Sequence, residues 1–123
     1  MHSDRIRQAL ADILHAIGLI EAWVGEAGGV EKAIAPDTQT RNAIERQLLI
    51  ISEAAIRLHR HDPEVAGRLA PSVDWAGVRG MGNFIRHKYD DLDPEIIADV
   101  LRTKLSELRT ACVAARKTLS PDH

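Results

Sequence analysis

Apolar residues recur at helical spacing along almost the whole chain. In the first segment they step by three or four residues from Ile6 to Val24, which predicts one buried helix stripe. Ser3 or Asp4 can cap this helix, and a cluster of glycines at positions 25–29 can end it. No segment alternates with the period of two that a half-buried strand requires. The pattern therefore predicts helices throughout.

A polar break at positions 35–37 separates this segment from a second helical pattern. That pattern predicts a helix from about Thr38 to His61. An aspartate followed by proline at positions 62–63 is a typical helix start, so we expect a short helix from there to about Leu69.

Two more helices are predicted in the second half of the chain. Asp74 can cap a helix that begins at Trp75 and fades near Tyr89, and Asp93 followed by Pro94 begins the last one. The apolar positions of that last helix are Ile97, Leu101, Leu105, Leu108, Cys112 and Ala115 or Leu119. Helices with short connections predict an all-α fold, an antiparallel bundle of four to five helices. We expect a single domain over residues 1–119 and a short frayed tail at 120–123.

Composition agrees with an ordinary globular domain. The 123 residues are 45% hydrophobic and 28% charged, with a formal net charge of −2. A general nucleic-acid binder would usually be basic overall, so any RNA contact must come from locally concentrated positive charge. Cys112 is the only cysteine, which excludes an internal disulfide and fits a reducing compartment. No apolar run resembles a signal peptide or a membrane span, so we expect a cytoplasmic protein with no membrane contact.

His87 stands out among the six histidines because of its neighbours. Arg79, Arg86 and Lys88 place three positive charges around it, and three of the four aromatic residues lie nearby. Asn83 is four residues before His87, so both side chains leave one face of the predicted helix. The plain alternative is a solvated helix end before an acidic turn.

The remaining histidines offer no convincing ligand set, and we expect neither a metal nor another cofactor. Structural or solvent-facing roles are expected for His2, His15, His59, His61 and His123. Gly80 and Gly82 also need a reason, because each glycine inside a helix costs about 1 kcal/mol relative to alanine. Close approach of another helix or access for a ligand would supply one.

Three segments, in order, resemble the HepT-like toxins of the HEPN superfamily over nearly the whole chain. Arg46-Gln-Leu-Leu-Ile-Ile-Ser-Glu-Ala is similar to the family's Arg-Asn-Leu-x-Ile-Ile-Gly-Glu-Ala stretch. Residues 71–75 resemble the loop that ends in Pro-Trp. Gly80-Met81, Asn83, His87, Tyr89 and Asp93 resemble its Gly-Met-Arg-Asn-x-x-x-His-x-Tyr-x-x-x-Asp motif. The resemblance implies a HEPN-like helical fold.

This resemblance implies the toxin of a bacterial or archaeal toxin–antitoxin pair, a metal-independent ribonuclease. It implies a homodimer in which motif helices from two chains face one cleft that takes RNA. His87, with Asn83 and Arg86, would then carry catalysis, because histidine can accept the 2′-OH proton or donate one to the leaving oxygen. The resemblance also implies a minimal nucleotidyltransferase antitoxin that silences the toxin by adenylylating a tyrosine, here Tyr89. The added AMP would bring negative charge beside the histidine.

The motif arginine is the clear departure, because Gly82 stands in its place. We expect Arg86 to stabilise charge on the phosphoryl oxygens instead, with Arg79, Arg46 and Lys88 as alternative phosphate contacts. The departure leaves a second interpretation open, a non-catalytic HEPN dimer that binds nucleotide or docks a nucleotidyltransferase. A purely structural helical bundle is the third.

Overall fold

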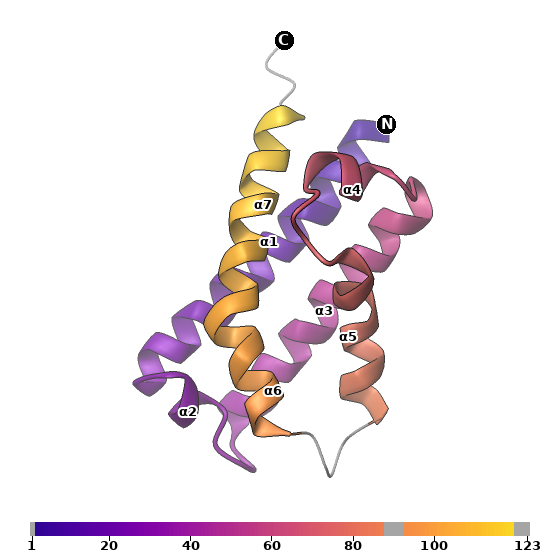
Figure 1. Ribbon diagram of the computed structural model, residues 1–123. Helices are drawn as coiled ribbons and strands as arrows, with labels where there is room; N and C mark the ends of the chain where they lie inside the picture. Colours follow the sequence, from indigo (N-terminus) through magenta and orange to yellow (C-terminus); the bar gives the residue numbers. More distant parts are fainter. Residues whose placement is uncertain (1, 88–92, 120–123) are drawn as a thin grey trace.

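The computed structural model is a bundle of helices whose long segments run in alternating directions (Figure 1). It describes residues 2–87 and 93–119, and the side chains of residues 2, 3 and 87 lie outside this description. No β-strand occurs in these described ranges. The predicted all-α antiparallel bundle is therefore confirmed. The long segments are α1 (His2–Ala27), α3 (Gln39–His61), α5 (Trp75–His87) and a last one made of α6 (Pro94–Asp99), the π-helical turn η1 (Val100–Lys104) and α7 (Leu105–Thr118).

Helix α3 is the central element, because it packs against α1 on one side and α5 on the other. The main core joins the inward stripes of α1, α3 and α7, as their spacing predicts. Fully buried members include Ile13, Ile17, Ile44, Leu48, Ile51 and Cys112. Burial of one large aliphatic side chain contributes about 1.5–3 kcal/mol relative to exposure, so this shared stripe holds α3 in place.

A pair of glycines ends α1. Gly28 and Gly29 have φ angles of 94° and 131°, which glycine adopts without the strain that a Cβ brings. The Gly29 N–H donates to the carbonyl of Val24 at 3.0 Å, which satisfies one of the last helical acceptors. The predicted helix end is confirmed. The single turn α2 (Val30–Ala33) that follows was not predicted.

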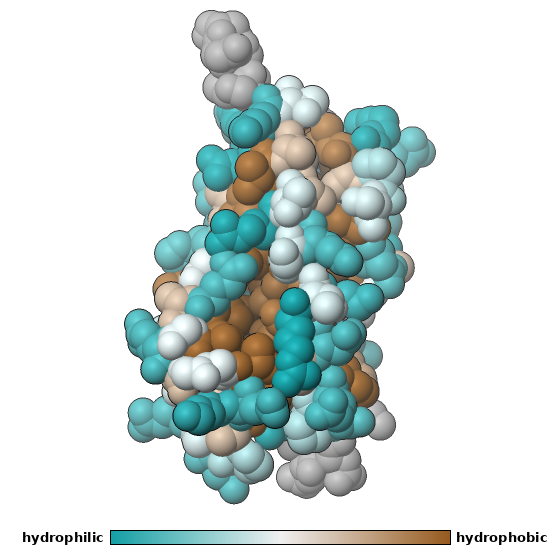
Figure 2. Space-filling model, turned by 60° about the vertical axis from the view of Figure 1, so that its left-hand side comes forward, coloured by the Kyte–Doolittle hydropathy of each residue, from teal (hydrophilic) through white to brown (hydrophobic). Residues whose placement is uncertain are grey.

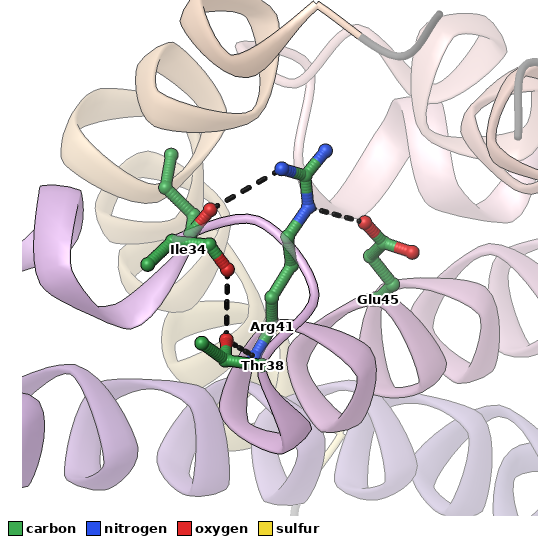
Figure 3. A network of polar contacts seen from close by, with 5 residues as sticks. Ile34, Thr38, Arg41 and Glu45 are labelled. Atoms are coloured by element: carbon green, nitrogen blue, oxygen red, sulfur yellow. Dashed lines mark hydrogen bonds and ion pairs between the residues drawn. The ribbon is translucent and has the colours of Figure 1, made fainter. Parts of the chain in front are cut away.

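A polar network fixes the start of α3 (Figure 3). The Thr38 hydroxyl accepts a hydrogen bond from the Arg41 N–H at 3.1 Å and donates to the Ala35 carbonyl at 2.8 Å. The Arg41 guanidinium donates to the Glu45 carboxylate at 2.9 Å and to the Ile34 carbonyl at 3.3 Å. Thr38 is therefore the helix cap, close to where the pattern predicts that the helix begins, and the segment that follows α2 is tied to α3.

The short helix α4 (Val65–Leu69) ends where predicted but begins later. Asp62 is the C-cap of α3, and its carboxylate accepts a hydrogen bond from the Glu64 N–H at 3.1 Å. The Val65 N–H donates to the Asp62 carbonyl at 3.2 Å. The Asp-Pro pair therefore forms a turn, and α4 starts after it.

Aspartates begin the two later helices, as predicted. The Asp74 carboxylate accepts from the Gly77 N–H at 3.0 Å at the start of α5. The Asp93 carboxylate accepts from the Glu95 N–H at 2.9 Å at the start of α6. The predicted fading of α5 near Tyr89 lies outside the described residues.

Figure 2, turned to bring the left-hand side of Figure 1 forward, shows separate apolar patches between hydrophilic side chains. The large apolar residues that are exposed in the described part of the chain are Ile96 and Val113. No described helix combines the length and the apolar character needed to cross a membrane.

Candidate functional site

The polar residues of the candidate site leave the outer face of α5. Asn83 and Arg86 are exposed in the last two turns of this helix, and Arg79 is half-buried one turn earlier. At 100° per residue, positions 79, 83 and 87 leave the helix within an arc of about 80°. The helical geometry of α5 therefore places these three positions on one face, as the spacing predicts. Figure 1 shows the end of α5 at the opposite end of the bundle from the start of α1 and the end of α7.

His87 is the last residue of α5, and its side chain lies outside the described part of the structure. Lys88 and Tyr89 also lie outside it. The roles expected for the histidine ring, the Lys88 ammonium and the Tyr89 hydroxyl therefore stay predictions. What is described is the helix that carries the histidine and the residues before it.

Arg86 reaches from α5 to α3. Its Nη2 atom lies 3.3 Å from Oε2 of Glu53, and the two side chains are 46% and 47% exposed. An ion pair this open to water contributes about 0–1 kcal/mol, so it orients the arginine without holding it tightly. A guanidinium has five N–H donors, which leaves several for a phosphate. Arg86 is therefore placed where α3 and α5 meet the surface.

Arg46, an alternative phosphate contact, lies on the same face of α3 as Glu53. Seven residues separate the two, which returns to the same face after an axial distance of about 10 Å. Arg46 is exposed. The structure thus gives α3 an exposed cation on the side that also contacts Arg86.

The close crossing of α3 and α5 explains Gly82. This residue is buried, and its N–H donates to Oγ of Ser52 at 3.0 Å. The Ser52 hydroxyl in turn donates to the Arg79 carbonyl at 2.7 Å. A Cβ on Gly82 would lie 2.8 Å from Oγ of Ser52, closer than real Cβ atoms approach, and 3.0 Å from its Cβ, which is an unusually tight contact. Of the two reasons expected for a helical glycine, close helix approach holds at this position.

Gly80 has no such restriction. It is exposed, and a Cβ there would meet nothing within 4 Å. It lines a hollow of about 600 Å³ between α5 and the last helical segment, together with Met81 and Phe84 on one side and Ile96 and Val100 on the other. The two glycines of the motif therefore have different surroundings, one at a helix crossing and one at an open apolar hollow.

Cys112 is the one free thiol of the described residues, and it is buried. Burial raises the pKa of the Cys112 thiol to about 12, so it stays protonated near neutral pH and is a poor nucleophile. Among the residues that the structure describes, no three His, Cys, Asp or Glu side chains are grouped to hold a metal ion. His15 is exposed on α1, as predicted.

Two residues that contact α5 were not predicted, Ser52 and Glu53. A sequence signal for Ser52 does exist in the HepT-like pattern that the chain resembles. That pattern has glycine where Ser52 stands on α3 and arginine where Gly82 stands on α5. The pattern and this chain thus differ in which of the two helices carries the smaller residue, and in this chain the two positions face each other.

Comparison with known proteins identifies a matching protein family. A family model described as Ribonuclease HepT-like matches residues 13–115, a range that includes all of α3 and α5. No curated protein and no solved structure matches the chain significantly.

Proposed function

The chain belongs to the HepT-like ribonuclease family, and we propose that it is the toxin of a toxin–antitoxin pair, an endoribonuclease that cuts RNA without a metal ion. The observation that carries this proposal is the outer face of α5. Asn83 and Arg86 are both exposed there, and His87 closes the same helix. These residue types on one accessible face suit the handling of a phosphate.

The proposed reaction is an attack of the RNA 2′-hydroxyl oxygen on the adjacent phosphorus, which displaces the 5′-oxygen of the next nucleotide. One imidazole accepts the hydroxyl proton, and a second donates a proton to the departing oxygen. One chain supplies one His87, so a homodimer that faces two α5 helices across a cleft provides both. The Arg86 guanidinium stabilises the charge on the phosphoryl oxygens, and the Asn83 amide donates a hydrogen bond to the same group.

The proposed regulation acts on Tyr89. A nucleotidyltransferase antitoxin would join the phenol oxygen to the α-phosphorus of ATP and release pyrophosphate. The resulting phosphodiester adds bulk and a negative charge two residues from His87, and this charge repels an RNA phosphate. The toxin would then lose its ribonuclease activity although His87 itself is unmodified.

A second candidate function is a non-catalytic HEPN dimer that binds nucleotide or docks a nucleotidyltransferase. Two observations favour it. Gly82 stands where the family motif has arginine and is buried against Ser52, and the substitute Arg86 is already paired with Glu53. In this case the exposed face of α5 would bind its ligand without cutting it.

Expression of the chain by itself tests the first proposal. We expect growth arrest with the natural sequence and normal growth with His87→Ala. His15→Ala is the matched control, because His15 is an exposed histidine on α1, and it should arrest growth like the parent. Arrest that persists in His87→Ala contradicts the ribonuclease proposal.

The purified protein separates the two candidate functions. The ribonuclease should cut RNA in the presence of EDTA, and Arg86→Ala and Asn83→Ala should each slow the cutting. A protein that cuts no RNA but binds a nucleotidyltransferase supports the non-catalytic dimer. Mass spectrometry after incubation with that partner and ATP tests the regulation, since an AMP adduct should form on the parent and be absent from Tyr89→Phe.

A further inference from the structure

A second concentration of positive charge lies at the other end of α3 from the proposed cleavage site. A hollow of about 570 Å³ opens between the first half of α1 and the last turns of α3. Both helices contribute polar side chains to its lining: Arg5, Gln8 and Asp12 from α1, and Arg57, Arg60 and His61 from α3. Positive charge therefore gathers here in a chain whose formal net charge is −2.

The one carboxylate in this lining is already engaged. Asp12 accepts from the Arg57 guanidinium at 2.5 Å and from the Gln8 amide at 2.8 Å. Arg5 and Arg60 are exposed and have no ion pair with a carboxylate of the described residues. Two guanidinium groups thus remain available on opposite walls of the hollow, one on each helix.

We infer that this hollow binds a phosphate group, supplied by the backbone of an RNA strand or by a free nucleotide. The planar guanidinium fork matches the oxygens of a phosphate in a bidentate manner, and two such groups face the hollow. The lining has no Phe, Tyr or Trp side chain on which a base could stack; its one ring is the His61 imidazole, and its one amide is bonded to Asp12. Contacts of this kind hold the phosphate and do not distinguish bases.

The arrangement of α3 favours an RNA strand as the source. Arg46, Glu53 and Arg60 follow one another at intervals of seven residues and so share one face of the helix. Arg46 and Arg60 are exposed and stand about 21 Å apart along the axis at the helical rise, while Glu53 between them is paired with Arg86. A strand cut near the end of α5 would reach the hollow along this face. This part of the inference rests on the proposed ribonuclease function.

Binding of a labelled single-stranded RNA of about ten nucleotides, followed by fluorescence anisotropy, tests the inference. The measurement uses His87→Ala protein in EDTA, so that the strand stays whole. The further substitutions Arg5→Ala and Arg60→Ala in this protein should lower its affinity for the RNA roughly tenfold. They should also reduce the slope of log K against log salt by about 1 to 2. Arg102→Ala with Arg109→Ala is the matched control, because it removes the same charge outside the hollow and should leave both values nearly unchanged.

Titration calorimetry with AMP and with inorganic phosphate distinguishes the two sources. Weaker RNA binding in the Arg5/Arg60 variant, with no AMP binding by the parent, assigns the hollow to the RNA backbone. AMP binding that the variant loses, with RNA binding unchanged, assigns it to a free nucleotide. Unchanged binding of both ligands overturns the inference, as does an equal loss in the control. If the parent binds RNA through the hollow but cuts none, the ribonuclease function fails and the phosphate site stands.

Discussion

Alanine at position 82 is expected to destabilise the protein, although alanine is the better helix former. In an unhindered helix, replacing glycine by alanine stabilises by about 1 kcal/mol. At position 82 the new Cβ would lie 2.8 Å from Oγ and 3.0 Å from Cβ of Ser52. Rotation of the Ser52 hydroxyl away from it breaks the bonds to the Arg79 carbonyl and from the Gly82 N–H, at 2.7 Å and 3.0 Å. The Ser52 Cβ can retreat only if α3 moves.

The magnitude follows from two opposing effects. Overpacking of a buried contact costs about 1–3 kcal/mol, and a buried hydroxyl left without a partner costs about the same. The gain in helix propensity offsets about 1 kcal/mol of this. Gly82→Ala should therefore lower the free energy of unfolding by roughly 1–5 kcal/mol. Gly80→Ala is the matched control on the same helix, since nothing lies within 4 Å of its Cβ, and it should be neutral or stabilising.

Urea unfolding followed by circular dichroism measures these differences from the shift in midpoint at constant slope. The decisive arm repeats Gly82→Ala in a Ser52→Gly background, where both crowding atoms are gone. There the alanine should be neutral or stabilising, because only the helix propensity remains. A Gly82→Ala protein as stable as Gly80→Ala would refute the reasoning. A penalty that persists unchanged in the Ser52→Gly background would refute it as well.

Three further outcomes are expected. Glu53→Gln should change the free energy of unfolding by less than about 1 kcal/mol, because the ion pair of Glu53 with Arg86 is half exposed. The same substitution should raise the affinity for RNA if Arg86 contacts phosphate, and weaker RNA binding would contradict that role of Arg86. Cys112 should resist thiol reagents in the native protein and react fully in denaturant. Burial raises the pKa of the Cys112 thiol to about 12, so the unfolded chain loses the thiol proton at a lower pH than the folded protein does. The stability that the buried, protonated thiol contributes is therefore present below about pH 8.5 and falls as the pH rises above it. This fall in the free energy of unfolding should be smaller in Cys112→Ala. Asp74→Ala should cost about 1 kcal/mol in urea unfolding through loss of the cap on the Gly77 N–H, and no change would contradict the cap.

The main helices could be predicted because their signals are local. Thr38, Asp74 and Asp93 each begin a helix by accepting a hydrogen bond from a backbone N–H two or three residues later. The turn α2 has no such signal, since one helical turn is too short to show a period. The start of α4 was misplaced because the carboxylate of Asp62 bonds inside a turn, where a sequence pattern cannot distinguish it from a helix cap.

The candidate site likewise has one part that the sequence predicts and another part that it does not. The shared face of Arg79 and Asn83 depends only on helical spacing, so the sequence predicts it. The contacts of Ser52 with Gly82 and of Glu53 with Arg86 depend on where α3 and α5 cross, across about thirty residues of chain. Nothing local in either helix specifies that crossing. A glycine inside a helix is compatible with a close approach, as at Gly82, or with open space, as at Gly80, and it does not identify a partner.

The absence of the motif arginine is coupled to packing between two helices. At this crossing, only one of the facing positions has room for a side chain, and here Ser52 takes it and hydrogen-bonds to the backbone of α5 on both sides of the contact. The family pattern has the opposite choice, glycine on α3 and arginine on α5. With Ser52 in place, the guanidinium that the proposed ribonuclease needs for the phosphate would come from a neighbouring position. Arg86 lies one turn after Gly82, is exposed, and already reaches α3 through Glu53. The same crossing that excludes arginine at position 82 therefore leaves a second arginine at the surface beside it.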